Sequence, residues 1–343
     1  MQYQITNQSK LLSQSGELIQ KGYATSPLLQ YLRKDVGLKS RLKEWDYYLI
    51  QNDSSVVALT VAKSMSFLLV SASLIDLVTL KETTKSTVGI ASRKNFSMPE
   101  SSEIGDINYH NKNNYISFIH RNRTRELSLY MRGFLNNEDL DISFILSQEP
   151  EDSMVIATPF YEGDKMFYYN RKIIGMRAIG TAHLGTQTFS FPACNSFGLF
   201  DWGRGVWPYH TTWYWSAAQG MIGGDLFGFN LGYGFGDTRK ATENMLFFNG
   251  NASKLEEVTF HIPMNEKNGY EYKKPWRVTS SDERIQMIFT PVFERSSNLN
   301  AILLSTDQHQ VFGAFTGEAF LDDGTRVLIQ DLFGFIERVE NKW

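Results

Sequence analysis

The stretch WDYYLIQNDSSVVALTVA, residues 45–62, shows the pattern on which the whole fold depends. Its two halves are rich in β-branched and aromatic residues, which favour extended structure. Only Asp53 and Ser54 separate the two runs, and a two-residue polar link of this kind is typical of a β-hairpin. The stretch therefore predicts two antiparallel strands joined by a tight turn.

Similar runs recur along the chain. They are SFLLVSASLIDLVTL (66–80), KMFYYNRKIIGMRAIG (165–180), TQTFSFPA (186–193), LEEVTFHIP (255–263), RIQMIFTPVFER (284–295), QVFGAFTGEAFL (310–321) and TRVLIQDLFGFIERV (325–339). Asp322-Asp323-Gly324 joins the last two as a second predicted turn. Helical periodicity is weak, and its best candidate is residues 27–43, interrupted by Gly37. Short strands without alternating long helices predict a mostly β protein of antiparallel barrels or sandwiches, with few short helices.

The length of 343 residues suggests about two domains. Composition changes near residue 178: one tryptophan lies before that point and six lie after it. We therefore place the boundary within residues 175–186, which gives domains of residues 1–180 and 181–343.

Several classes of function are disfavoured by the sequence. A net charge of −3 gives no electrostatic reason to expect nucleic acid or an anionic membrane as a partner. The single cysteine, Cys194, excludes an intrachain disulfide and a cysteine zinc cage, and the six histidines lack metal-ligand spacing. No P-loop, GxGxxG or GxSxG motif occurs, so we expect neither a metal nor a cofactor.

The sequence also predicts where the protein resides. It begins MQYQITNQSK, without the charged start and apolar core of a signal peptide. The longest charge-free apolar run of the first half has twelve residues, 64–75, too few to cross about 30 Å of hydrocarbon as a helix. We expect a cytoplasmic protein without an integral membrane segment.

Residues 178–236 are unusually poor in charge. Among these 59 residues only Asp201, Arg204 and Asp225 are charged. Such a segment is expected to be buried or to line a cavity. An unpaired buried ion costs several kcal/mol, so Asp201 and Arg204 are expected to pair with each other or with a ligand.

The same segment is rich in aromatic residues and glycine. FGLFDWGRGVWPYHTTWYW (197–215) holds eight aromatic residues, and Trp213 and Trp215 would point to one side of a strand with Tyr214 opposite. GMIGGDLFGFNLGYGFG (220–236) holds seven glycines, which mark bends or close approaches to the backbone. Aromatic walls beside small residues suit a pocket for a bulky apolar ligand. The alternative is that the aromatic residues are simply core.

The candidate site residues come from this segment and its immediate continuation. The catalytic candidates are Asp201, Arg204 and His210. The candidates for ligand binding are Trp202, Trp207, Tyr209, Trp213, Trp215, Asp225, Asn230 and Asp237.

Five motifs carry a family resemblance. They are LKEWDYY (42–48), TPFYEGDKMFYYNRK (158–172), FDWGRGVWPYHTTWYW (200–215), GFNLGYGFGDTRKATEN (228–244) and KPWR (274–277). Together they resemble the DUF2804 family, which is itself distantly similar to the AttH and carotenoid 1,2-hydratase group. That resemblance implies two tandem lipocalin-like domains. It also implies that Asp201-Trp202-Gly203 and Trp213-Tyr214-Trp215 correspond to an acidic segment and a W-x-W strand beside a ligand cavity.

Three functions are compatible with these features. The first is a cofactor-independent hydratase, cyclase or isomerase acting on a bulky apolar or terpenoid-like molecule, with an aspartic acid as proton donor and tryptophan faces stabilising a cation. Arg204 beside Asp201 would keep that acid ionised and would instead favour binding of a polar or anionic head group. The second is a non-catalytic carrier or sensor of an apolar or amphipathic small molecule. The third is a dry aromatic interface between two barrels, with no ligand.

Overall fold

The computed structural model describes residues 2–342 apart from 65–66, 91–95, 268 and 302–303. Its described residues form strands and two short 3-10 helices, η1 (Arg33–Asp35) and η2 (Lys39–Arg41). The best helix candidate, residues 27–43, contains both of these short 3-10 helices but no α-helix. Leu29 and Tyr31 are both buried in one core at a spacing of two, which is the period of an extended chain.

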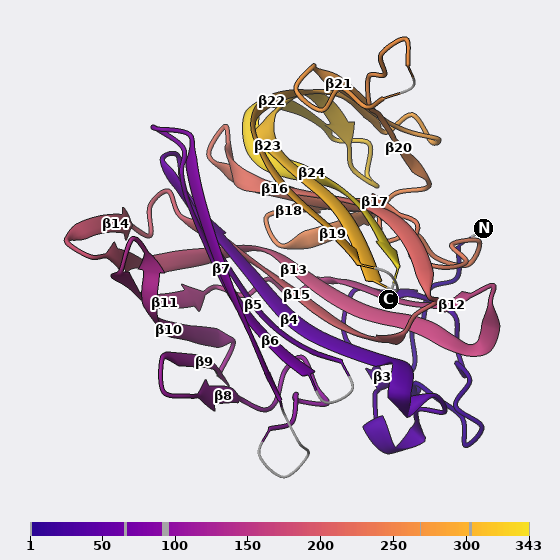
Figure 1. The fold of residues 1–343 in the computed structure, drawn as a ribbon. Helices are drawn as coiled ribbons and strands as arrows, with labels where there is room; N and C mark the ends of the chain where they lie inside the picture. The colour runs from indigo at the N-terminus through magenta and orange to yellow at the C-terminus, as the bar shows by residue number, and fades with distance from the viewer. Residues whose placement is uncertain (1, 65–66, 91–95, 268, 302–303, 343) are drawn as a thin grey trace.

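The first sheet has thirteen strands, drawn from indigo to rose in Figure 1. Ten follow the order β7-β6-β5-β4-β15-β13-β11-β10-β9-β8, while β12 and β14 pair with β13 and β2 pairs with β12. Their bounds are β2 Gly22–Ala24, β4 Leu42–Gln51, β5 Ser55–Ser64, β6 Phe67–Asp76, β7 Lys81–Ile90, β8 Ile107–His110, β9 Asn114–Arg121, β10 Thr124–Leu135, β11 Glu138–Ser147, β12 Met154–Phe160, β13 Gly163–Leu184, β14 Gln187–Phe191 and β15 Phe197–Val206. A separate parallel pair joins β1 (Ser9–Lys10) to β3 (Leu29–Gln30).

The second sheet has nine strands in the order β19-β18-β17-β16-β24-β23-β22-β21-β20. Their bounds are β16 His210–Ile222, β17 Asp225–Tyr233, β18 Met245–Phe248, β19 Asn251–Lys254, β20 Val258–His261, β21 Trp276–Ser280, β22 Ile285–Ala301, β23 Leu304–Phe320 and β24 Arg326–Lys342. Both sheets are antiparallel and curled, as Figure 1 shows. The fold is therefore the mostly β arrangement of two lipocalin-like units that the sequence predicts.

Both predicted hairpins are present. In β4–β5, Gln51 pairs with Val56 across the Asp53-Ser54 turn. In β23–β24, Phe320 pairs with Arg326, and Gly324 takes a positive φ of 84° in the turn.

The chain changes from the first sheet to the second between Val206 and His210. Residue 180 lies inside β13, which runs without interruption to Leu184, and β15 lies between β13 and β4. We therefore propose that the structural units divide within residues 207–209.

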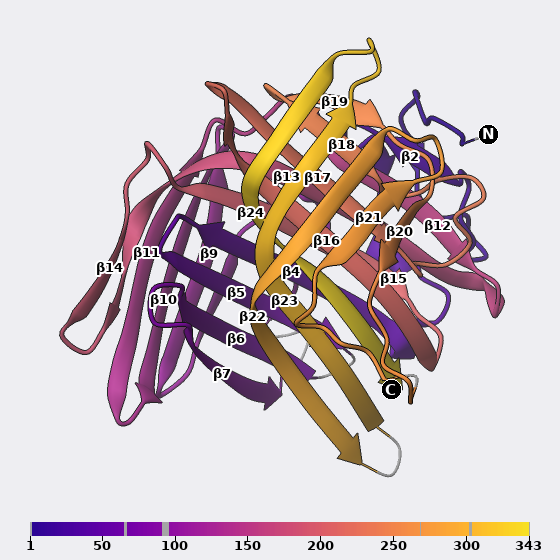
Figure 2. The same cartoon turned by 90° about the horizontal axis from the view of Figure 1, so that it is seen from above.

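Strand alternation sorts the apolar residues into three cores. One face of β4, β13 and β15 contributes Tyr48, Tyr169 and Phe200 to the core enclosed by the first sheet. The second sheet encloses its own core around Phe289 and Phe315. A third core lies between the sheets, where the opposite faces of β4 and β13 meet β16 and β24. Figure 2 shows the second sheet crossing over β4, β13 and β15 at this junction.

Candidate functional site

A cavity of about 550 Å³ lies between the two sheets. The first sheet, together with Trp207 directly after β15, contributes the following lining residues: Lys43, Trp45, Tyr47, Ala58, Thr60, Ala62, Leu69, Ser71, Ser73, Glu82, Thr84, Ser86, Tyr168, Lys172, Asp201 and Trp207. The lining from the second unit is Trp213, Trp215, Phe235, Arg295, Ser296, Ser297, Gln308 and Glu337. Aromatic side chains thus form one part of the wall, and hydroxyl groups of β5–β7 form another. The aromatic junction between the sheets is therefore not filled by side chains throughout.

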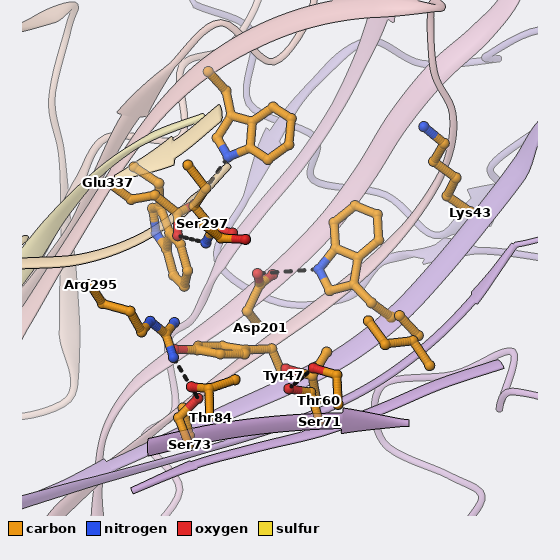
Figure 3. Close-up of a pocket in the computed structure, with 18 of the residues that line it drawn as sticks. Lys43, Tyr47, Thr60, Ser71, Ser73, Thr84, Asp201, Arg295, Ser297 and Glu337 are labelled. Carbon is orange, nitrogen blue, oxygen red and sulfur yellow. Dashed lines mark hydrogen bonds between the residues drawn. The ribbon is translucent and has the colours of Figure 1, made fainter. Parts of the chain in front are cut away.

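Asp201 lines this cavity (Figure 3). Three nitrogen atoms surround its carboxylate. Its Oδ1 accepts a hydrogen bond of 2.6 Å from Asn170 Nδ2, and its Oδ2 accepts one of 3.2 Å from Trp45 Nε1. Lys172 Nζ lies 3.4 Å from Oδ1. Strand register explains this grouping, because Lys172 of β13 and Tyr47 of β4 are both direct partners of Asp201 in β15.

Lys172 connects the cavity to a second, fully buried carboxyl group. Its Nζ lies 3.4 Å from Glu243 Oε2, the same distance as from Asp201. It also donates to Asn170 Oδ1 at 3.0 Å and lies 4.7 Å from the centre of the Trp215 ring. Burial raises the pKa of Glu243 to about 7 against the opposing effect of Lys172.

Glu337 is the other buried carboxyl group of the cavity wall. Trp213 Nε1 donates to its Oε1 at 3.2 Å, and Gln308 Nε2 donates to its Oε2 at 3.0 Å. Burial raises the pKa of Glu337, and the Asp201 charge adds to that rise. The two donors and the charge of Arg295 oppose it.

Arg204 lies on the other face of β15 and does not pair with Asp201, a pairing that is one of the two alternatives left open by the sequence. Residues three positions apart in a strand point to opposite faces. The Arg204 guanidinium is fully buried in the first sheet, 2.9 Å from Asp46 and 3.6 Å from Glu44. It stacks 4.2 Å from the ring centre of Trp202, which shares its face. Neither Arg204 nor Trp202 lines the cavity.

Three of the other predicted residues line the cavity. Trp207, Trp213 and Trp215 line the cavity with Asp201, and Tyr214 packs on Tyr233 on the opposite side of β16. The strand alternation expected for Trp213-Tyr214-Trp215 is therefore confirmed.

The remaining four polar or charged candidates and Tyr209 do not line the cavity. Half of the side chain of His210 is exposed, and it lies 3.0 Å from Glu340, while Tyr209 is 49% exposed. Asp225 is exposed and accepts from Asn249. Asp237 forms an ion pair with Arg239 and accepts a hydrogen bond from Tyr161. Asn230 is buried outside the cavity lining and accepts a hydrogen bond of 2.7 Å from Trp215 Nε1. It therefore holds the Trp215 ring in position in the cavity wall.

Sequence reasoning missed Trp45, Lys172, Arg295 and Glu337. A signal for Glu337 exists, because Phe333, Phe335 and Glu337 alternate along FGFIERV, and an acid in an inward-facing series is unexpected unless it is paired. Nothing comparable marks Trp45 and Lys172, because only strand register brings them beside Asp201.

Within the described residues, no group of three or more His, Cys, Asp or Glu side chains is arranged to hold a metal ion. In the same part of the chain, no helix has the length and apolar character needed to span a membrane.

Fold and cavity together define a protein of two lipocalin-like units with a tryptophan-walled space between them. The family profile of the domain of unknown function DUF2804 matches residues 2–343, and the chain belongs to that family. A comparison with curated proteins finds no match.

Several solved structures have a similar fold. Kievitone hydratase from Nectria haematococca is 11% identical, with a TM-score of 0.51 and 98% coverage of both chains. A protein assigned as AttH from Nitrosomonas europaea is 11% identical, with a TM-score of 0.49 and coverage of 87% of this chain and 92% of that one. CghA in complex with Sch210972 is 7% identical, with a TM-score of 0.46 and coverage of 88% of each chain.

Proposed function

We propose that this protein is a cofactor-independent enzyme of the hydratase, cyclase or isomerase type, acting on a bulky, largely apolar alkene such as a terpenoid. The observation that carries the proposal is that two carboxyl groups in different environments, Asp201 and Glu337, face one tryptophan-walled cavity. An enzyme can obtain an acid and a base from one residue type by holding two carboxyl groups in environments that move their pKa values apart. The shared fold with a protein named as a hydratase supports the same reading.

Glu337 is the proposed proton donor. Its raised pKa keeps a larger fraction of the group protonated near neutral pH than an exposed glutamic acid would have. An acid in this state transfers its proton to one carbon of the substrate double bond, and the electron pair of that bond forms the new C–H bond. The second carbon then carries the positive charge.

The cavity wall is suited to that charge. Trp45, Trp207 and Trp213 lie in contact around one part of it, and an indole face stabilises a nearby cation by up to about 2 kcal/mol when water is absent. The Asp201 carboxylate adds a negative charge fixed in position by Trp45 and Asn170.

Asp201 is the proposed proton acceptor. A carboxylate offers roughly four acceptor positions, and three are taken by Trp45, Asn170 and Lys172. In hydration, a water molecule adds to the cationic carbon and releases its proton to Asp201. In isomerisation, the proton comes instead from a neighbouring carbon, and a new double bond forms.

Incubation in heavy water tests this reaction even when the identity of the product is not known in advance. A panel of terpenoid alkenes is incubated with the protein, and products are examined by mass spectrometry for carbon-bound deuterium. We expect incorporation by the wild type and its loss in Glu337→Gln and Asp201→Asn, while Glu318→Gln, a control outside the cavity, retains it. Bound but chemically unchanged alkenes would contradict the enzymatic proposal and favour a carrier.

A further inference from the structure

We propose that the ligand of this cavity carries an anionic oxygen, of the carboxylate type, that binds between the guanidinium of Arg295 and the hydroxyl of Tyr47. This inference rests on the proposed function only in placing the ligand in the intersheet cavity. It adds the chemical class of the ligand's polar end and the side chains that recognise it.

Arg295 is the first part of the argument, because its charge has no carboxylate partner within ion-pairing distance among the described residues. Its Nη1 donates to Ser73 Oγ and its Nη2 donates to Gln310 Oε1, both at 2.6 Å. Both acceptors are neutral, whereas the buried Arg204 and Arg171 each pair with at least one carboxylate. Arg295 therefore presents a net positive charge and unused N–H groups to the cavity that it lines.

Tyr47 supplies the second, independent observation. Its hydroxyl oxygen is buried and has no hydrogen-bond partner of normal geometry among the described residues. Burial raises the pKa of Tyr47 to about 12, so this group is a neutral O–H donor at ordinary pH. The charge of Arg295 and a hydrogen-bonding interaction with the side chain of Gln310 act on that pKa in the opposite direction. A buried donor without an acceptor costs about 1–3 kcal/mol, which a ligand oxygen would recover.

The surrounding surface fits a polar end rather than an apolar one. Ser73 and Thr84 hydroxyls are hydrogen-bonded at 2.6 Å, and Ser71 and Ser86 are bonded at 2.8 Å, across β6 and β7. Figure 3 shows Arg295, Tyr47, Ser73 and Thr84 gathered at one side of Asp201, with Lys43 on the other side.

Glu82, Glu337 and Asp201 are the acidic groups in the cavity wall, and Asp201 has Lys172 as a cationic partner at 3.4 Å. Glu82 lines the cavity and accepts a hydrogen bond from the hydroxyl of Thr84. Glu337 has its pKa raised by burial, which reduces the negative charge opposing an anionic ligand. The cavity is thus divided into an anion-accepting end and a tryptophan-walled end, the form expected for an amphipathic carboxylate with a bulky apolar body.

The test compares dansylaminoundecanoic acid with its methyl ester, which differ in charge at one end. Binding to the full-length protein is followed by dansyl fluorescence. We expect the wild type to bind the acid at least tenfold more tightly than the ester. Arg295→Gln should abolish that preference while still binding the ester, Arg295→Lys should retain part of it, and the exposed control Arg326→Gln should leave it unchanged.

Each other outcome counts against a defined claim. Equal binding of acid and ester by the wild type, or an unchanged preference in Arg295→Gln, overturns this inference alone. An equal loss of both ligands in Arg295→Gln would show that Arg295 only holds β22 against β6, and it also overturns the inference. Failure of both probes to bind the wild type would count against the cavity as the ligand site, and so against the proposed function.

Discussion

Asp201 and Arg204 lie three residues apart in β15, and their side chains point to opposite faces of the first sheet. The carboxylate of Asp201 opens onto the cavity between the sheets, whereas the guanidinium of Arg204 is buried inside the first sheet, 2.9 Å from Asp46. These two of the three charged residues of the charge-poor segment therefore belong to separate networks. One network is proposed to serve the ligand, and the other holds β15 against β4.

The first prediction concerns that structural network. Arg204→Met leaves the buried Asp46 without its cationic partner, and breaking a buried pair in this way costs about 3–5 kcal/mol. We expect urea unfolding to show a loss of that size. The exposed ion pair of Arg326 with Glu318 provides the control, because Arg326→Met should cost less than about 1 kcal/mol. A near-neutral Arg204→Met would show that the buried network is not a determinant of stability.

The second prediction concerns the pH dependence of stability. The folded state holds the Glu243 proton up to a pKa of about 7, while the ordinary value is 4.5. Between these values folding takes up a proton, so this group makes the protein less stable as pH rises, by about 3 kcal/mol in total. Glu243→Gln removes that contribution and should gain stability relative to the wild type as pH increases across this window.

Urea unfolding of both proteins at about pH 5 and about pH 8 measures the difference. Lys254 is a useful reference, because burial lowers its pKa to about 7, and its contribution therefore favours stability as pH rises above that value. The Glu243 charge itself raises the pKa of Lys254, so Glu243→Gln lowers that pKa further and adds a Lys254 contribution of the same sign to the measured difference. A difference between the two proteins that stays constant with pH would show that Glu243 is ionised throughout.

The sequence predicts the strands well because their signal is local. The Asp53-Ser54 hairpin, the turn at Gly324 and the alternation of Trp213-Tyr214-Trp215 all depend on neighbouring residues. Glycines of the 220–236 segment also behave as expected: a Cβ on Gly232 would lie 2.0 Å from Glu243 Oε1.

The composition of the site depends on long-range register and was predicted only in part. Asp201 and three tryptophans of the segment line the cavity as expected. Lys172 and Trp45 come from strands far away in sequence, and no local pattern reveals that β13 and β4 flank β15. Strand alternation separates positions 201 and 204 in the same way that it places Trp213 and Trp215 together, so it favours separate partners for Asp201 and Arg204.

The third prediction concerns the glycine that follows Trp202. A Cβ on Gly203 would lie 2.0 Å from Cζ2 of Trp45, whose indole donates to Asp201. Gly203→Ala should therefore displace this ring, cost about 1–3 kcal/mol and weaken ligand binding. Gly163→Ala, where the nearest atoms of Met166 lie at 3.8 Å, is the matched control and should be close to neutral. Titration with the dansyl probe measures the effect on binding, and urea unfolding measures the effect on stability. Unchanged binding by Gly203→Ala would show that Trp45 does not contribute to the ligand site.

The fourth prediction concerns the pH–rate profile of the proposed reaction. An acid catalyst must be protonated, so activity falls as pH rises through the pKa of Glu337. The hydrogen bond from Trp213 lowers that pKa by stabilising the charged form. Trp213→Phe keeps an aromatic face but removes the N–H donor, so the alkaline limb of kcat should move to higher pH.

Two variants complete this test. Tyr214→Phe alters the neighbouring residue on the opposite face of β16 and should leave the limb where it is in the wild type. Glu337→Gln cannot donate a carboxylic proton, and we expect kcat to fall by about 10²–10⁴-fold with no alkaline limb from this group. A limb that moves to lower pH in Trp213→Phe, or one that persists in Glu337→Gln, would assign the acid to another residue, because removing a donor to a carboxylate can only favour its protonated form.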